Sequence, residues 1–215
     1  MNGRNEAQII WALVGSTQLV PVKLMAVDVD NVNGLGSFLF TITMDSRIFN
    51  IPSNLDGTVN ASYVVNGWFL TSTGKQIVCD EGRVKQVSGS TYLYNLSYIC
   101  VSLGPAVGPQ GTGQLVTFNF QPGSQLGTSP INFTVSQLVT GGQNPAFITH
   151  TPVTGQFEIV KCANVYGGDT TVNLNDIFQI AAWFAKNNPT YDLNGDNTVN
   201  LLDIFIAARQ FATYC

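Results

Sequence analysis

Five oxygen-bearing side chains near the C-terminus are spaced as a cation-binding loop requires. Asp192, Asn194, Asp196, Asn200 and Asp203 occupy positions 1, 3, 5, 9 and 12 of one loop. Position 7 is Thr198, which would contribute its backbone carbonyl. Ca²⁺ is a hard cation that gathers roughly 6–8 oxygen ligands from carboxylates, amides and backbone carbonyls. The stretch therefore predicts a calcium-binding loop.

This spacing is that of an EF-hand calcium loop, and the stretch departs from it at two positions. Position 6 is Asn197, where an EF-hand has the glycine of a sharp turn. Asn is the non-glycine residue that best tolerates a left-handed backbone. Position 12 is Asp203, where an EF-hand has a longer, bidentate Glu. The alternative interpretation is an Asx-rich turn that only caps a helix.

The loop and the segment after it occur twice, which favours calcium binding over a simple turn. Residues 168–178 (GDTTVNLNDIF) match residues 195–205 (GDNTVNLLDIF) at a fixed offset of 27 residues. Such a repeat defines a module of two loop–helix units. The first copy keeps four ligand positions, 5, 7, 9 and 12, as Asp169, Thr171, Asn173 and Asp176. Val165 and Gly167 stand at positions 1 and 3, unless a one-residue insertion lets Asn164 serve, so we expect one good site and one weak or empty site.

Residues 162–215 resemble a dockerin, the calcium-dependent docking domain of cellulosome-type assemblies. The second copy nearly completes the pattern D-x-N-G-D-x-x-V-N-x-x-D. The resemblance implies Ca²⁺ as cofactor and a docking contact at loop positions 10 and 11, which are Leu174, Asn175, Leu201 and Leu202. Four phenylalanines recur on the two expected helices, and we expect most of them to form the module's own small core: Phe178, Phe184, Phe205 and Phe211.

The four cysteines allow three pairings. Cys162 and Cys215 bracket the dockerin-like module, whose ends lie close together in that family, so a bridge there would clasp it shut. Cys79 and Cys100 lie in strand-like segments and form the second favoured pair. The alternative is four free buried thiols. Three sequons, at Asn60, Asn95 and Asn132, would suit a secreted glycoprotein, although such triplets also arise by chance.

Composition excludes several classes of function. Charged residues make up 10% of the 215 residues, the net charge is −4, and no basic run occurs. Nucleic-acid binding is therefore not expected, because it relies on clustered Lys and Arg. No stretch approaches the ~20 apolar residues of a membrane span. The chain has the composition of a neutral, turn-rich, extracellular β-protein.

Short β segments separated by Gly, Asn and Pro turns fill the chain from Glu6 to Val160. The expected strands are residues 6–14, 19–29, 35–44, 62–70, 76–79, 91–101, 114–120, 131–138 and 155–160. Residues 9–14 are also apolar enough for a signal-peptide core, but a strand is the better interpretation. Phe38, Phe40 and Ile42 alternate with polar residues, which is typical of a sheet with one buried face. The fold class is mainly β, a β-sandwich or jelly roll.

Residues 5–160 resemble a cohesin, the receptor domain that pairs with a dockerin. The resemblance rests on residues 34–51 (GLGSFLFTITMDSRIFNI), residues 111–120, the segment 131–138 and the closing strand 155–160. It implies a sandwich that offers one sheet face to a helix face of the partner. Residues 159–164 (IVKCAN) contain no Gly/Ser or Pro linker, so we expect a stiff joint between the two domains.

Both halves of a docking pair thus occur in one chain. A stiff joint makes docking onto the next copy easier than folding back, and heterologous contacts that do not close give open filaments. The first hypothesis is therefore an extracellular structural protein that self-assembles head to tail into a filament or surface array. Its partners would be other copies of itself or a cohesin- or dockerin-bearing protein.

Two alternatives stay open. The chain could be a non-catalytic adaptor or carbohydrate-binding module that docks a different partner. It could also assemble by strand exchange, in which the segment around residues 9–14 leaves its own sandwich and completes a neighbour's sheet.

Catalysis is not expected. The only histidine, His150, lies in a Thr-His-Thr-Pro turn, where we expect an exposed imidazole without a function. A glycosidase needs two facing carboxylates. No such pair can be chosen among the acids of the sandwich, which are Asp28, Asp30, Asp45, Asp56, Asp80, Glu81 and Glu158.

Overall fold

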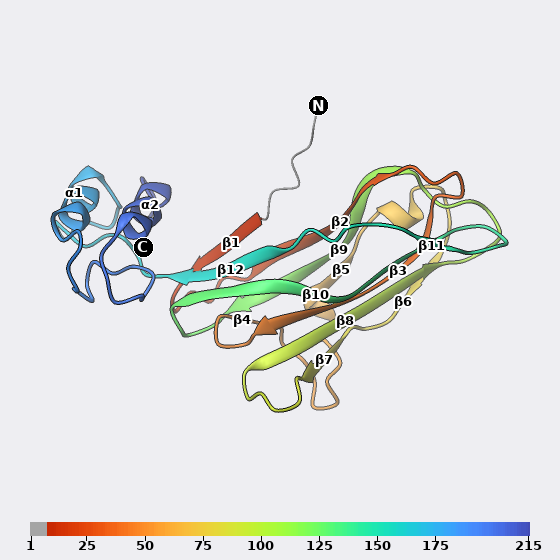
Figure 1. The fold of residues 1–215 in the computed structure, drawn as a ribbon, viewed down its shortest axis with the longest axis horizontal. Helices are drawn as coiled ribbons and strands as arrows, with labels where there is room; N and C mark the ends of the chain where they lie inside the picture. Colours follow the sequence, from red (N-terminus) through yellow and green to blue (C-terminus); the bar gives the residue numbers. More distant parts are fainter. Residues whose placement is uncertain (1–7) are drawn as a thin grey trace.

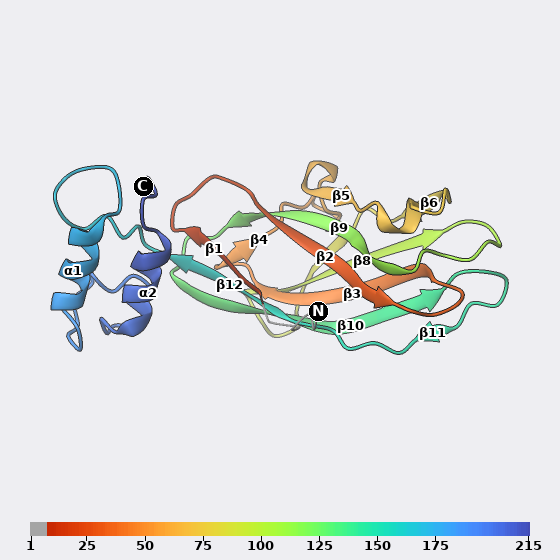
Figure 2. The same ribbon diagram turned by 90° about the horizontal axis from the view of Figure 1, so that it is seen from above.

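A computed structural model describes residues 8–215, and most of them form two packed β-sheets (Figures 1 and 2). Residues 5–7, where the sandwich and its first strand are expected to begin, lie outside the described residues. The larger sheet has the order β1-β12-β10-β3-β8-β6, with β11 on β10 and β7 on β8. The smaller sheet has the order β2-β9-β4, with β5 also on β9. This arrangement confirms the mainly β, sandwich-like fold class.

The larger sheet contains β1 (Gln8–Leu13), β3 (Leu35–Asp45), β6 (Ile77–Cys79), β7 (Arg83–Gln86), β8 (Leu93–Ser102), β10 (Gly127–Thr140), β11 (Phe147–Ile148) and β12 (Gly155–Val160). The smaller sheet contains β2 (Val20–Val29), β4 (Phe49–Asn50), β5 (Val64–Asn66) and β9 (Gly111–Pro122). The strand β1 is paired with β12 in parallel, whereas the other ladders are antiparallel.

Aromatic side chains from both sheets fill the space between them. In β3 every second residue from Phe38 to Met44 is buried, as its alternating pattern predicts. Phe40 of β3 and Tyr98 of β8 each meet Phe118 of β9 edge-on, with ring centroids 5.8 and 5.4 Å apart. Edge-to-face contacts of this kind are favourable beyond the area that they bury. They hold the two sheets together at the centre of the sandwich.

Two sequence-based expectations for strands are wrong. Residues 62–70, expected to form one strand, contain only the three residues of β5 between two 3₁₀ turns, Ala61–Tyr63 and Phe69–Thr71. The Asn60 side chain accepts the Ser62 N–H at 3.1 Å and so favours a turn there. The strand β7 was missed, because only Val84 among its four residues is apolar and faces Leu96 of β8.

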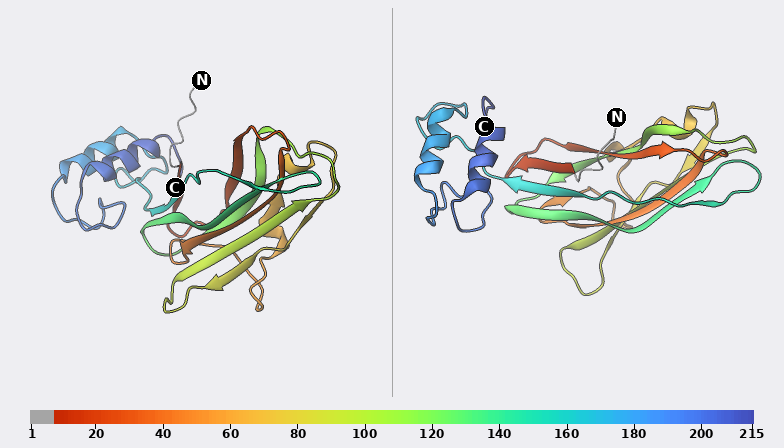
Figure 3. Two further views of the ribbon diagram at one scale, coloured as in Figure 1. Left: turned by 45° about the vertical axis from the view of Figure 1, so that its right-hand side comes forward. Right: turned by 45° about the horizontal axis from the view of Figure 1, so that its top comes forward.

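Residues 162–215 form a separate body at one end of the long axis of the molecule (Figures 1 and 3). It contains α1 (Leu174–Ala182) and α2 (Leu201–Arg209), each of which follows one of the two repeated loops. Its apolar cluster includes Val172, Ile180, Val199 and Ile206 and is distinct from the core of the sandwich. No helix within residues 8–215 has the length and apolar character that crossing a bilayer requires.

Hydrogen bonds and packing fix this C-terminal module to the sandwich without a linker. The Lys161 N–H donates to the Leu193 carbonyl at 2.9 Å. The buried Gln210 amide accepts the Ala163 N–H at 2.9 Å and donates to the Lys161 carbonyl at 3.0 Å. The joint is therefore tied at Lys161 and Ala163 to the second loop–helix unit, through its loop and through the end of its helix.

The strand β1 also contributes to this joint. Its Trp11 and Leu13 pack against the module's apolar cluster, together with Val160 of β12. The Arg209 guanidinium of α2 lies 4.9 Å from the centre of the Trp11 ring and donates to Glu158 of β12 at 2.8 Å. The module thus rests on the outer face of β1 and β12.

Candidate functional site

Both helices of the module begin at a loop residue that caps them. Asn173 and Asn200 each precede a helix, and their side chains accept the N–H of Asn175 and Leu202 at 2.8 Å. In each case the Asp three residues later returns the contact to the backbone of the cap, which completes a capping box. The repeated sequence therefore produces two helices whose first turns have the same geometry.

In the second loop, two carboxylates are buried and organise the backbone. Asp203 is fully buried and accepts the Leu193 N–H at 2.6 Å and the Asn200 N–H at 2.8 Å. Asp192 is 4% exposed and accepts the N–H groups of Gly195 and Asn197 at 2.8 and 2.9 Å. The ion pairs described between residues 8 and 215 involve neither carboxylate. Two buried acids without a cationic partner are costly, and a bound cation would compensate them.

The backbone at position 6 of this loop has the shape that the sequence suggests. Asn197 adopts a left-handed conformation with φ of 72°, beside Gly195 with φ of 79°. A left-handed residue at position 6 makes the sharp turn for which EF-hands use glycine. In the first loop the left-handed residues are Gly167 and Gly168 instead, and Thr170, at position 6, is not among them.

The third acid of the second loop, Asp196, is exposed and is surrounded by hydrogen-bond donors. The amides of Asn194 and Asn200 donate to Asp196 Oδ2 at 3.0 and 2.9 Å, and the Thr198 N–H donates to Oδ1 at 2.9 Å. Desolvation, the largest contribution, raises the pKa of Asp196, but the hydrogen bonds from Asn194, Thr198 and Asn200 together outweigh it and leave the pKa below its usual value. This carboxylate is therefore ionised and ready to act as a ligand.

The donor types of the second loop fit Ca²⁺, although its side chains are not gathered around one point. Within residues 8–215, no three His, Cys, Asp or Glu side chains lie close enough together to hold a metal ion. In addition, the Asn194 and Asn200 amides turn their N–H₂ groups, not their oxygens, toward Asp196. Rotation of these two amides would replace donors with acceptors around Asp196. The loop then offers only oxygens, as Ca²⁺ requires.

The first loop has the same frame with fewer ligands. Asp176 is fully buried and accepts the N–H groups of Val165 and Asn173 at 2.8 Å, as Asp203 does for its own loop. Val165 at position 1 packs its side chain against the module's apolar cluster. The Asn164 amide donates to the Asp169 carbonyl at 2.6 Å. The first loop therefore contains two carboxylates, and position 1 contributes packing instead of an oxygen.

The two loop–helix units hold one another by reciprocal backbone hydrogen bonds. Val199, at position 8 of the second loop, donates to Lys186 and accepts from Ala185 at the end of the first unit. Val172, at position 8 of the first loop, donates to Thr213 and accepts from Ala212 at the end of the second unit. The two sets of contacts are related by the 27-residue offset of the sequence. The two loop–helix units are therefore related by a pseudo-two-fold axis in the structure.

The expected docking residues lie on an exposed apolar surface that is larger than the sequence indicated. Leu174, Leu201 and Leu202 are 56–57% exposed, and Asn175 is exposed as well. Phe178 and Phe205, one turn further along each helix, are 65% and 63% exposed. We call these six residues the helix patch. In each helix, the Leu at loop position 10 and the Phe four residues later lie on the same face. This spacing was the sequence signal that could have placed the two phenylalanines on the docking surface.

The expectation that most of the phenylalanines form the module's own core is wrong. Phe184 and Phe211 are 49% and 50% exposed, in addition to the two in the helix patch. The core is built instead from Val, Ile, Leu and Ala residues of β12, the joint, the two loops and the two helices. Small aliphatic side chains suffice because the two nine-residue helices and two loops enclose little volume.

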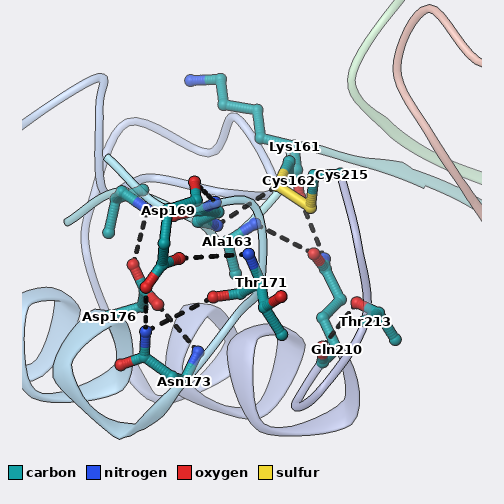
Figure 4. The surroundings of a disulfide bond; sticks show 12 residues. Lys161, Cys162, Ala163, Asp169, Thr171, Asn173, Asp176, Gln210, Thr213 and Cys215 are labelled. Carbon is teal, nitrogen blue, oxygen red and sulfur yellow. Dashed lines mark hydrogen bonds between the residues drawn. A yellow bond between two sulfur atoms is a disulfide. The ribbon is translucent and has the colours of Figure 1, made fainter. Parts of the chain in front are cut away.

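The structure pairs Cys162 with Cys215 and Cys79 with Cys100, the pairing favoured from the sequence, and no cysteine of the described chain is free. The first bridge closes the module beside the Gln210 hydrogen bonds (Figure 4). The second bridge links the edge strand β6 to β8.

The three sequon asparagines differ in accessibility. Asn60 and Asn132 are exposed, whereas Asn95 is half-buried on β8 and accepts the Thr43 hydroxyl at 2.6 Å. Asn95 and Asn132 both flank Thr43 of β3, so they lie on the same outer sheet face.

His150, expected to be exposed, is half-buried and bonded at both ring nitrogens. Its Nε2 lies 2.7 Å from the Ser136 hydroxyl and its Nδ1 lies 2.9 Å from the Ile148 carbonyl. The histidine thus braces the loop after β11 against β10. Of the sandwich acids, Asp45 pairs with Arg47 and Glu158 with Arg209. The hydrogen bond from the Arg47 side chain holds the pKa of Asp45 below its usual value.

Comparison with known proteins finds similar folds but no related sequence. No protein-family model and no curated protein matches the chain. The seventh ScaB type I cohesin of Pseudobacteroides cellulosolvens matches with a TM-score of 0.50 and 12% identity, over 76% of this chain and 94% of that one. A non-cellulosomal cohesin of Archaeoglobus fulgidus matches with a TM-score of 0.45 and 14% identity, over 72% and 88% of the two chains. A Clostridium thermocellum cohesin–dockerin complex matches with a TM-score of 0.44 and 20% identity, over 71% and 94%. The β-sandwich of this chain therefore has a cohesin-like fold.

Proposed function

We propose that the chain is an extracellular structural protein whose copies dock head to tail, module onto sandwich, into a filament or surface array. The observation that carries this proposal is the helix patch, in which five large apolar side chains are more than half exposed on two short helices. Large apolar side chains that stay exposed in such numbers commonly mark a protein–protein interface.

The attachment of the module favours docking between copies over docking within one chain. The joint is held by the hydrogen bonds of Lys161 and Gln210 and by the Arg209–Glu158 ion pair. The module lies at the end of the sandwich, beyond the ends of β12 and β10 (Figures 1 and 2). A helix patch fixed in this position cannot reach the middle of its own sheet, so the partner must be another molecule.

A second copy offers a complementary surface on the outer face of its larger sheet. Ile99 and Val101 of β8 and Val78 of β6 are 37%, 40% and 57% exposed, and the half-buried Leu39 lies beside Ile99 in the sheet. We call these four residues the sheet patch. Their neighbours Ser37, Thr41 and Ser97 on β3 and β8 are uncharged. An apolar helix face can therefore bury these side chains without burying an unpaired charge.

Charge also favours this pairing. The exposed Arg83 and Lys85 of β7 lie beside Ser97 and Asn95 at the margin of the sheet patch. The module, residues 162–215, has five acids and two bases and so a formal charge of −3, which one bound Ca²⁺ would reduce to −1. Opposite charges steer association and set orientation more than they set affinity. Docking on this face also requires Asn95 and Asn132 to be free of glycan.

We propose that Ca²⁺ binds the second loop and holds the module in its docking-competent shape. Asp192, Asn194, Asp196, Asn200 and Asp203, with the Thr198 carbonyl, would hold the ion, which would supply positive charge to buried carboxylates. The buried Asp192 and Asp203 and the left-handed Asn197 support this assignment. Two disulfides favour an extracellular location, because such bonds persist in oxidising compartments.

The test is self-assembly of the full chain, followed by light scattering and electron microscopy in millimolar calcium. We compare the unmodified chain with Leu174→Glu/Phe178→Glu on α1 and with Leu201→Glu/Phe205→Glu on α2. Two buried apolar side chains contribute roughly 3–5 kcal/mol, so charging the helix that docks should weaken association by more than about 100-fold. Because the targets are exposed, the variants should still fold.

The matched control is Val32→Glu, which charges an equally apolar, 80% exposed residue in the turn between β2 and β3. This control should polymerise as the unmodified chain does. Polymers unaffected by either double substitution would contradict docking through the helix patch and point to strand exchange at β1. A monomer in every sample would contradict self-assembly and favour the adaptor alternative.

A further inference from the structure

The strand β1 leaves one of its edges without hydrogen-bond partners. The Val14 N–H donates to the Val160 carbonyl at 2.8 Å. In a parallel ladder the backbone groups of alternate residues point to the same neighbour, so Ala12 and Ile10 also face β12. The N–H and C=O groups of Ile9 and Trp11 must then face the opposite side. Within residues 8–215, no hydrogen bond reaches them.

The other free edges of the two sheets are protected in the usual ways. The strand β2 has Pro21, Lys23 and two irregularities in its register. The strands β4, β5 and β6 are two or three residues long. The strand β7 exposes Arg83 and Lys85. Short length, Pro, Lys and bulges are the devices by which edges avoid pairing with other chains.

The edge of β1 has none of these devices. Its sequence, QIIWAL, contains no charge, no Pro and no Gly, and its ladder with β12 is regular over six residues. Ile9 is 56% exposed and lines an open groove of about 650 Å³ between β1, β12 and α2. Leu126, Leu202 and Phe205 contribute to the same groove. An uncovered, uncharged, six-residue edge beside an apolar groove is a surface suited to pairing with another chain.

We propose that β1 pairs with β1 of a second copy, in an antiparallel and two-fold symmetric manner, to join two sandwiches side by side. The register of this pairing follows from the unpaired N–H and C=O groups of Ile9 and Trp11. Ile9 of one copy lies opposite Trp11 of the other, and the two-fold axis passes between the two Ile10 residues. Each Ile9–Trp11 pair exchanges two N–H···O=C bonds, so four bonds cover both edges.

The partner that best fits the free edge of β1 is the same edge of a second copy. Antiparallel pairing of a strand with its own copy satisfies the same groups on both sides, as a closed two-fold interface requires. No like charges meet, because residues 8–13 are uncharged. The pairing also places Ile9 of each copy beside the large Trp11 of the other, on the face that adjoins the groove. This lateral contact is made by backbone groups that head-to-tail docking does not use, and it would join two filaments.

The first test is sedimentation velocity on the full chain with the helix patch charged at Leu174 and Phe178, and in parallel at Leu201 and Phe205. We compare Ile9→Pro with Ile9→Ala in both backgrounds. Proline removes the N–H that faces the free edge and leaves the ladder with β12 intact, whereas alanine keeps that N–H. The expected result is a closed dimer that Ile9→Pro weakens by at least about 10-fold and Ile9→Ala retains.

The second test is a cysteine placed at the symmetry axis. Ile10→Cys should form a dimer linked by a disulfide, because the two Ile10 residues are directly opposite. Ala12→Cys, two residues from the axis, should not. The native cysteines are all paired, so they provide no background. A dimer that persists in Ile9→Pro, equal cross-linking at residues 10 and 12, or the absence of any closed dimer would each overturn the proposal.

Discussion

At the scale of single residues, the two loops differ by a small number of oxygens. Asp176 and Asp203 are both fully buried, and each accepts the N–H groups of positions 2 and 9 of its loop, so each would order its loop even without a metal. What separates the loops is position 1, where Asp192 presents a buried carboxylate and Val165 packs into the core. Because calcium affinity depends on ligand charge and number, the second loop is the one that we expect to bind.

This difference leads to a prediction at position 5, where both loops have an exposed Asp. Asp196→Asn should weaken calcium binding by about 10-fold or more, because it removes one of three carboxylates from the loop. Asp169→Asn is the matched control and should leave affinity unchanged. Isothermal titration should find one site per chain. Equal effects of the two substitutions, or two sites of similar affinity, would show that the first loop also binds.

At the scale of elements, the joint connects the second loop to the sandwich by several short contacts. A Cβ at Gly195 would lie 3.0 Å from the Leu126 side chain, so this loop sits directly against the turn before β10. The helix that follows the loop places Arg209 over Trp11 and beside Glu158. The second loop and α2 therefore both contact the sandwich directly.

The bridge between Cys162 and Cys215 should determine the stability of the module more than that of the sandwich. It closes a loop with a sequence separation of 53 residues, and in the chain-entropy model this contributes about 4 kcal/mol. The Cys162→Ser/Cys215→Ser variant should therefore lose amide protection in α1 and α2 while β3 and β8 stay protected. Hydrogen exchange by mass spectrometry measures both.

The matched control is Cys79→Ser/Cys100→Ser, which opens a loop with a separation of 21 residues within the sandwich. Its loss of protection should appear in β6 and β8. A uniform loss across the chain in either variant would mean that module and sandwich unfold as one unit, and would contradict two separately stabilised cores.

At the scale of the whole molecule, the two proposed docking surfaces lie on different parts of a long, stiff particle. The helix patch belongs to the module, which lies at one end of the long axis (Figures 1 and 3). The sheet patch is on the outer face of the larger sheet. The two surfaces are not the same, so their contact is heterologous and can continue indefinitely. The edge of β1 would add a closed, two-fold contact. That contact joins two copies side by side and does not extend the filament.

Charge should control how fast such particles meet. Arg83→Glu/Lys85→Glu reverses the margin of the sheet patch, so it should lower the rate of association by about 10-fold or more at low salt. The control Lys23→Glu, on β2 of the smaller sheet, makes half of this change of net charge away from that face and should have much less than half of the effect. Stopped-flow light scattering measures the rate. The difference should vanish in high salt because of screening, and a difference that persists there would contradict steering.

The sequence by itself determined the features that depend on neighbouring residues along the chain. The loop spacing around Asp192 and the 27-residue repeat predicted two capped helices, and the alternation in residues 38–44 predicted a strand with one buried face. These signals are local, because helix caps and strand alternation follow from backbone geometry within a few residues. The missed strand β7, with one apolar residue, and the turns around β5, which lie in an apolar run that was expected to be a strand, show the limit of local patterns.

Only the tertiary structure decided which surfaces are covered. Periodicity placed Phe178 and Phe205 on helices, but not on the exposed face, because that depends on how two helices and two loops close around their aliphatic residues. The parallel pairing of β1 with β12, and the free edge that it leaves, joins residues that are more than 140 positions apart. The burial of His150 depends on Ser136 of β10 in the same way. Such contacts are set by the packing of the whole chain, so no local pattern of residues could reveal them.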